Sequence, residues 1–316
     1  AGALPGCDDS KSAYCVRDTD CAANERCADG VCTLKLLPDS GEDGLTGDLG
    51  PGDGQSDSVD ALAPDVLTDT APSHDGLTCK ANNDDVIARD EMPIAAGRSV
   101  SYTIGTGLTV NLVGTKKAGR THWSLKANAA DDKKTVADLL EVFAWAKGDY
   151  PNATYATLIG ENEKAYGVFQ ATPTALSLLG VISKDEAVPF VSGIDLPYGK
   201  PIDMLRFPVD KSLDYVSSAT ATGYFNGPYL YVTEEYTVKT LDVGELELPQ
   251  ITFPVVLVKV AIKQTPYANP FLVSRRTVFM FLSECYGIVG RIVVGDEVKE
   301  KDHGAVVADE RWRISF

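Results

Sequence analysis

YLYVTEEYTVKTL at residues 229–241 and FPVVLVKVAIK at residues 253–263 are the two stretches that decide the fold of this chain. The first alternates aromatic or β-branched residues with polar ones, which is the pattern of a strand with one buried face. The second is almost continuously apolar and is typical of a strand at the centre of a sheet. Gly244 and Pro249 lie between them and favour a change of chain direction. These stretches predict a β-rich domain.

Further candidate strands extend this pattern over the chain from residue 79 onward. They are rich in Val, Ile, Tyr, Thr and Phe, and Gly or Pro separates them at intervals suited to hairpins. The candidates are residues 99–104, 108–113, 121–127, 165–171, 215–225, 277–282 and 288–294. The sequence therefore predicts a mainly β domain over residues 79–316, built as an antiparallel sheet, a sandwich or a half-barrel.

One segment, KTVADLLEVFAWAK at residues 134–147, has a helical period. Val136, Leu139, Leu140 and Phe143 fall on one stripe of a helix, and the acidic residues fall off it. We expect one helix here, covering a face of the sheet or one end of a half-barrel.

Residues 1–36 form a cysteine-rich module. It holds five of the seven cysteines of the chain and few large apolar residues. A segment with so little to bury needs covalent bridges in place of a core. Zinc sites usually use tighter cysteine pairs, often with histidine, so the spacing favours disulfides in an oxidising compartment. The cysteines concerned are Cys7, Cys15, Cys21, Cys27 and Cys32.

The pairing inside this module is open, because four cysteines allow three connectivities. An interlaced arrangement of Cys15 with Cys27 and Cys21 with Cys32 is one of them. Cys7 is then the odd cysteine, and it has three options: a bridge to another chain, a different pairing within the module, or a free thiol.

Residues 37–78 form an acidic linker. They contain ten Asp or Glu residues, no Lys or Arg, and repeated Gly, Pro and Ser. Such a segment has too little apolar surface to offset chain entropy, so we expect a flexible spacer. The formal charge of the whole chain is −16, which opposes binding to nucleic acid or to an anionic lipid surface.

The chain carries several indications of export. Its numbering begins at Ala1 without an apolar leader, as expected after removal of a signal peptide. Its longest apolar run, residues 253–262, is interrupted by Lys259 and is shorter than the roughly 20 residues of a membrane-spanning helix. Together with the cysteines, these features predict a secreted protein, extracellular or at the cell surface, with no transmembrane segment.

Cys79 and Cys285 are the two cysteines outside the module, near opposite ends of the β domain. In an oxidising compartment they are expected to form a disulfide that closes a very long loop. The alternative is a nucleophilic Cys285, which requires a nearby histidine and a third group to orient it. His122 and His303 are available, but no local motif connects them with Cys285.

The text KANNDDVIARDE at residues 80–91 fits part of a calcium-binding loop, with Asn82, Asp84 and Glu91 at ligand positions. The first ligand position is occupied by Lys80, and a hydrogen-bonded turn is the alternative interpretation. Calcium is the only cofactor that the sequence suggests.

Glu234 and Glu235 lie in the alternating strand, so their side chains point to opposite faces. Glu234 falls on the more apolar face, where a carboxylate needs a partner such as Arg275 or Arg276. A structural ion pair explains this residue more simply than a catalytic acid does. The sequence contains no HExxH, GxSxG or phosphate-binding loop motif.

Several motifs carry a resemblance to known proteins. CVRDTDCAANERCADGVC at residues 15–32 is similar to short disulfide modules that precede Asp- and Pro-rich linkers in exported proteins of Gram-negative soil and predatory bacteria. From Cys79 onward the chain resembles domains of uncharacterised proteins in that group, and its central layout resembles lipoprotein-carrier-like half-barrels. The motifs are CKANNDDVIARDE (79–91), HWSLKA (122–127), AYGVFQATPTALSLLGVIS (165–183), MLRFPVD (204–210), ELELPQITFPVVLVKV (245–260) and FLSECYGIVGRI (281–292).

The sequence favours a non-enzymatic surface or appendage protein that acts through protein–protein contacts, including self-assembly. A second hypothesis is a carrier of lipid or another apolar ligand inside a half-barrel. An exported hydrolase is the third hypothesis, because catalytic carboxylates from distant strands leave little trace in one sequence. The carrier hypothesis predicts a lining formed by Phe143, Trp145, Leu178, Leu205, Val256, Val258 and Phe279.

Overall fold

The computed structural model describes residues 25–28, 31–34, 79–159, 165–295 and 304–316. The chain divides into two compact units, Ala1–Thr68 and Asp69–Phe316. In the first unit, β1 (Glu25–Ala28) and β2 (Val31–Leu34) form an antiparallel hairpin in which Cys27 is the backbone partner of Cys32. The side chains of the five amino-terminal cysteines and the predicted linker lie outside the described residues, so those predictions stay predictions.

The second unit is almost entirely β, which confirms the predicted fold class. A single 3-10 turn, η2 (Arg89–Glu91), precedes its strands. The strands are β3 (Arg98–Gly105), β4 (Thr109–Val110), β5 (Thr115–Lys117), β6 (Arg120–Ser124), β7 (Lys133–Leu139), β8 (Tyr155–Leu158), β9 (Ala165–Ala171), β10 (Ala175–Ser183), β11 (Ile194–Arg206), β12 (Asp214–Phe225), β13 (Tyr229–Glu247), β14 (Thr252–Pro266), β15 (Ser274–Ser283), β16 (Gly287–Val294), β17 (Val306–Val307) and β18 (Glu310–Ile314).

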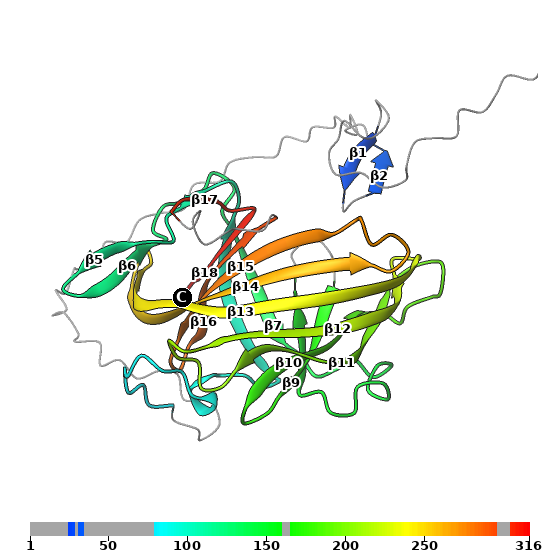
Figure 1. The fold of residues 1–316 in the computed structure, drawn as a ribbon, viewed down its shortest axis with the longest axis horizontal. Helices are drawn as coiled ribbons and strands as arrows, with labels where there is room; N and C mark the ends of the chain where they lie inside the picture. Colours follow the sequence, from blue (N-terminus) through cyan, green and yellow to red (C-terminus); the bar gives the residue numbers. More distant parts are fainter. Residues whose placement is uncertain (1–24, 29–30, 35–78, 160–164, 296–303) are drawn as a thin grey trace, which may run out of the picture. The chain divides into compact units, whose positions relative to one another are not determined.

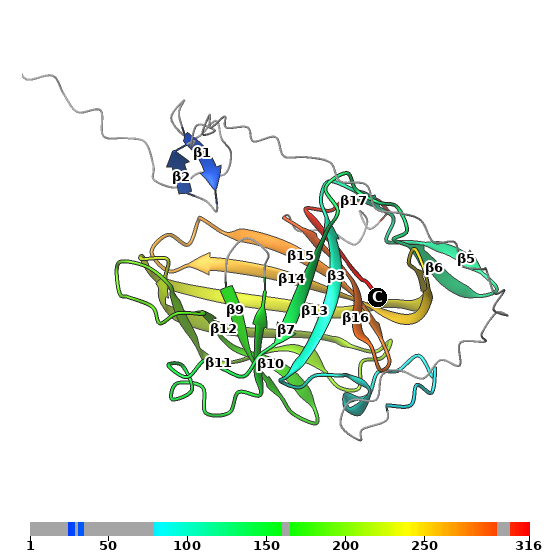
Figure 2. The same cartoon turned by 180° about the vertical axis from the view of Figure 1, so that it is seen from behind.

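Fourteen of these strands form one sheet that curls until its edges meet. The main path runs β7-β3-β18-β16-β15-β14-β13-β12-β11-β10-β9-β8, with antiparallel neighbours throughout. Leu140, directly after β7, exchanges two backbone hydrogen bonds of 2.8 Å with Ala156 of β8. In Figure 2, β3 and β7 cross steeply over β12–β14. The sheet is therefore nearly closed as a barrel.

The outer face of β14 and β15 is covered by a second layer. The segment around β4–β6, with β17, lays Trp123 and Leu125 over Leu257, Phe279 and Phe281. Trp123 meets Phe281 edge to face at 5.6 Å between ring centroids, a favoured aromatic geometry. Figure 1 shows the β5–β6 hairpin at the end of the sheet opposite the arrowhead of β14. The other face of the same strands is directed toward the barrel interior.

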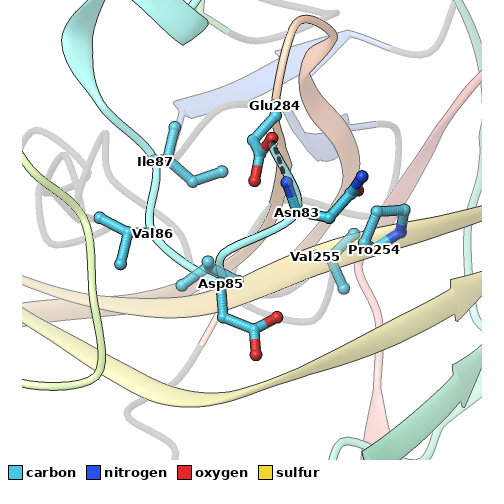
Figure 3. A pocket seen from close by; sticks show the side chains of 8 residues that line it. Asn83, Asp85, Val86, Ile87, Pro254, Val255 and Glu284 are labelled. Atoms are coloured by element: carbon cyan, nitrogen blue, oxygen red, sulfur yellow. Dashed lines mark hydrogen bonds between the residues drawn. The ribbon is translucent and has the colours of Figure 1, made fainter. Parts of the chain in front are cut away.

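The segment before β3 is fastened to the β15–β16 hairpin. Cys79 forms the predicted disulfide with Cys285, across a sequence separation of 206 residues. By loop entropy a bridge of this length stabilises the folded chain by about 5 kcal/mol. Next to it, the buried Glu284 carboxylate accepts hydrogen bonds from the backbone N–H groups of Asn82 (2.6 Å) and Asn83 (2.9 Å), as Figure 3 shows for Asn83.

The helix predicted at residues 134–147 is wrong. Residues 133–139 form β7, which pairs along its whole length with β3, from Arg98 opposite Leu139 to Ile104 opposite Lys133. Its side chains alternate, so Val136 is 55% exposed while Leu139 faces the barrel interior. Leu140 forms the bridge to Ala156, and the chain from Phe143 onward makes a turn, in which the Lys147 backbone N–H donates to the Phe143 carbonyl. Two unrelated pieces of chain, one strand and one turn, together produced the helical period.

Candidate functional site

The interior of the barrel holds a cavity of about 240 Å³. Protein interiors are close-packed, and voids larger than one water molecule are rare. This cavity exceeds the engineered apolar cavity of ~150 Å³ that stays dry and takes up benzene in another protein. A space of this size, inside a domain with a well-filled second core, is the strongest candidate for a functional site.

Nearly every strand of the barrel path contributes to the cavity wall. The wall is mainly aliphatic and aromatic, as expected of a site that binds apolar ligands. Its residues are Met92, Pro93, Ile94, Val100, Tyr102, Ala137, Leu139, Tyr155, Thr157, Leu158, Ile159, Phe169, Leu176, Leu178, Met204, Leu205, Tyr236, Val260, Ile262, Arg276, Val278, Met280, Tyr286, Gly287, Ile288, Arg291 and Trp312.

Two polar side chains of the wall, Tyr102 and Arg291, are held by the fold. Tyr102 donates a hydrogen bond of 3.0 Å to the Ile288 carbonyl, and burial raises the pKa of Tyr102 to about 12. Arg291 donates to the Ile159 carbonyl at 3.3 Å and lies over the ring of Trp312 at 5.2 Å. Both side chains therefore present a fixed arrangement to the cavity.

A buried polar cluster borders the cavity at Tyr236. Glu234 is 3% exposed and accepts hydrogen bonds from Tyr198 (2.6 Å), Tyr236 (3.0 Å) and Gln264 (2.6 Å). Ser274 in turn donates to Gln264 at 3.0 Å. Burial raises the pKa of both Tyr198 and Tyr236 well above the ordinary value, so both phenols stay protonated and donate. The carboxylate on the apolar face thus has two phenols and an amide as partners.

The sequence placed only part of the cavity lining. Leu178 and Leu205 line the cavity, and Val256 and Val258 lie in the core cluster of the same inner face. Phe279 was wrongly predicted to line the cavity, because the alternation of β15 turns its side chain to the outer face.

Phe143 and Trp145 were also wrongly predicted to line the cavity. Both pack in a separate cluster with Ala156, Val168 and Ile182. They belong to the turn that replaced the predicted helix, so they follow the outer surface of the barrel rather than its interior.

The calcium-loop residues take part in local turns. Asn82 and Asp84 hydrogen-bond to each other, with the Asp84 N–H donating to the Asn82 side-chain oxygen at 2.9 Å. Glu91 accepts the Ala88 N–H at 2.7 Å, and burial raises the pKa of Glu91. In the part of the chain that the structure describes, no three His, Cys, Asp or Glu side chains gather as metal ligands. Calcium binding by this loop stays a prediction.

In the described residues, no geometry supports a nucleophilic Cys285 or the catalytic carboxylates of a hydrolase. Cys285 is in a disulfide, so it has no thiol to react. The buried carboxylates Glu91, Glu234 and Glu284 each accept hydrogen bonds that hold the fold. A small pocket beside Glu284, drawn in Figure 3, measures about 10 Å³, the space of at most one water.

A charged cluster that was not predicted from the sequence lies beside the chain that follows β6. Arg311 and Arg313, 2% and 4% exposed, bind the two carboxylate oxygens of Asp132 at 2.8 and 2.6 Å. Arg313 also donates to the carbonyls of Leu125 and Lys126. These bonds satisfy the hydrogen-bonding capacity of the loop carbonyl groups, so the cluster has a structural role.

One end of the barrel carries an exposed aromatic stripe, defined by the exposed residues Phe190, Tyr229, Tyr231 and Tyr267 and the half-buried Tyr224. Phe190 contacts Tyr224, Tyr224 contacts Tyr229, and Tyr231 stacks on Tyr267 at 4.5 Å. Exposed apolar patches of this kind commonly mark contact surfaces.

Comparison with known proteins does not assign this chain to a family. No protein-family model, no curated protein and no solved structure matches the chain. Within the described residues, no helix is long and apolar enough to cross a membrane. The site therefore has to be interpreted from its own chemistry.

Proposed function

We propose that the β domain binds an elongated apolar ligand inside the barrel and acts as its carrier. The observation that supports this proposal is the cavity of about 240 Å³ with its mainly apolar wall. Water in such a cavity would find few polar partners, whereas an alkyl ligand gains about 0.8 kcal/mol for each CH₂ that leaves water. Of the functions that the sequence suggests, the carrier is the one that needs this space.

The lining residues extend along the strands of the cavity wall. Along β15 the wall begins at Arg276 and reaches the level of Leu282, which is the backbone partner of the lining residue Ile288. Six residues of strand correspond to about 20 Å at ~3.3 Å per residue. This length suits a single extended chain better than a compact ring system.

The remaining architecture fits an exported carrier. The sequence has a cysteine-rich segment followed by an acidic one ahead of the β domain, and its central layout resembles lipoprotein-carrier-like half-barrels. These sequence features support the proposal of a non-enzymatic carrier that acts outside the cytosol of a Gram-negative bacterium.

The test uses the full chain after removal of co-purified lipid. We expect saturable binding of the neutral dye Nile red with one site per chain, and apolar material in the solvent extract of the untreated protein. Met280→Trp fills the cavity and is expected to abolish dye binding, whereas Val113→Trp, at a position 60% exposed, leaves it unchanged. Absence of saturable binding by the wild-type protein would overturn the proposal.

Self-association is a second candidate function, and the exposed aromatic stripe favours it. Near the stripe, Phe271 and Leu272 are 93% and 65% exposed, which is unusual for large apolar residues. Light scattering across a concentration series is expected to show dimers or larger species that the double variant Phe271→Ser, Leu272→Ser shifts to monomer. A wild-type protein that stays monomeric at the highest concentration excludes this function.

A further inference from the structure

Arg276 occupies a distinctive position on the cavity wall. Tyr236, Ile262 and Arg276 are consecutive cross-strand partners on β13, β14 and β15, and all three line the cavity. The next lining residues along β15, Val278 and Met280, are only 7% and 5% exposed, whereas Arg276 is exposed. The guanidinium therefore lies where the apolar interior meets solvent.

The charge of the cavity wall differs from that of the chain. The chain has 45 acidic and 29 basic residues, yet among the described residues the charged side chains of the wall are Arg276 and Arg291, with no Asp or Glu. Arg291 is fixed by the Ile159 carbonyl and the Trp312 ring. The cavity thus presents positive charge within an acidic protein.

The neighbouring carboxylate does not neutralise Arg276 by direct contact. Both oxygens of Glu234, one row further toward the strand ends, already accept hydrogen bonds from Tyr198, Tyr236 and Gln264. Within the described residues, the Arg276 guanidinium forms no ion pair and no side-chain hydrogen bond, while its backbone belongs to the β14–β15 ladder. A guanidinium has five donors and is suited to bind a carboxylate or a phosphate in a forked geometry.

We propose that the ligand is an amphiphile whose anionic head group, a carboxylate or a phosphate ester, binds Arg276 at the cavity mouth while its alkyl chain fills the interior. This inference rests on the proposed carrier function and adds the class of ligand. The apolar wall provides most of the affinity, and the single guanidinium provides the discrimination between charged and neutral head groups.

The experiment measures displacement of Nile red by three probes that share one alkyl chain, namely palmitate, hexadecyl phosphate and hexadecanol. In the wild-type protein we expect the two anions to displace the dye at about tenfold lower concentration than the alcohol, as one charge-assisted hydrogen-bonding pair warrants. Arg276→Gln is expected to remove this difference and leave hexadecanol unchanged. The better of the two anions identifies the head group.

Arg275→Gln is the matched control, because Arg275 is the adjacent residue on the opposite face of β15. It is expected to keep the anion preference, and Arg276→Lys, which retains the positive charge, is expected to restore most of it. Equal displacement by anions and alcohol in the wild-type protein, or unchanged anion binding by Arg276→Gln, overturns the head-group assignment alone. Failure of the dye and of all three probes to bind overturns the carrier function with it.

Discussion

The two faces of the β14–β15 pair have similar composition and opposite packing. On the outer face, Leu257, Phe279 and Phe281 are each 0% exposed beneath the β4–β6 layer. On the inner face, Ile262 and Met280 border a cavity. Apolar residues thus fill the space on one side and leave it open on the other.

The difference arises from what faces each surface. The outer face has a layer of chain laid directly on it, so its apolar side chains are buried between two layers. The inner face has the opposite walls of the barrel across from it, including Val100 of β3 and Leu139 of β7. The cavity therefore results from the curvature and closure of the sheet, and not from a shortage of large side chains.

The largest expected change in the free energy of unfolding comes from truncating one aromatic ring on each face. Phe281→Ala on the outer face removes a ring that is fully buried against Trp123, and it is expected to lower the free energy of unfolding by about 3 to 5 kcal/mol. Phe169→Ala on the cavity wall removes a ring that already lacks neighbours on one side, so its cost is expected to be lower by at least about 1 kcal/mol. Urea unfolding of both variants measures the difference.

Phe169 also stacks on Tyr155 at 5.1 Å, so some loss of stability is certain to accompany its truncation. Nile red binding by the folded Phe169→Ala variant provides the control, because an enlarged cavity still accepts the dye. Equal losses of stability for the two truncations would show that the inner face is packed as tightly as the outer one.

A smaller effect is expected from enlarging one leucine on each face. Leu257→Phe adds volume to the filled outer core and is expected to cost about 1 to 3 kcal/mol. Leu178→Phe adds the same volume beside the cavity and is expected to cost less than about 1 kcal/mol while lowering the affinity for Nile red. Thermal unfolding and dye titration on the same samples give both quantities. A Leu178→Phe variant as unstable as Leu257→Phe contradicts the presence of usable space.

Much of the fold was predictable because strands leave a local signal. The alternation at residues 229–241 correctly placed Glu234 on the buried face and Glu235 on the exposed face of β13. The Cys79–Cys285 disulfide was correctly predicted from the number of cysteines and from the expectation of an oxidising compartment. The helix prediction at residues 134–147 failed because pairing with β3, a long-range interaction, decided the conformation of β7.

The site was less predictable, because a cavity is defined by the distance between walls that lie far apart in sequence. Where a strand is apolar on both faces, as in β15, the sequence does not distinguish inner Met280 from outer Phe279. Arg276 was noticed only as a partner for Glu234, whose partners are instead Tyr198, Tyr236 and Gln264. The break in apolar character between Ser274 and Thr277, next to a long buried run, was the available signal for a cavity mouth.

The Cys79–Cys285 bridge also determines how the domain bears mechanical load. A pull on the chain ahead of Cys79 passes through the sulfur atoms directly into the β15–β16 hairpin. The residues from 80 to 94, which include the cavity-lining Met92 and Pro93, are thereby bypassed. Traction on the amino-terminal side is therefore not transmitted along the segment that carries these two residues of the cavity wall.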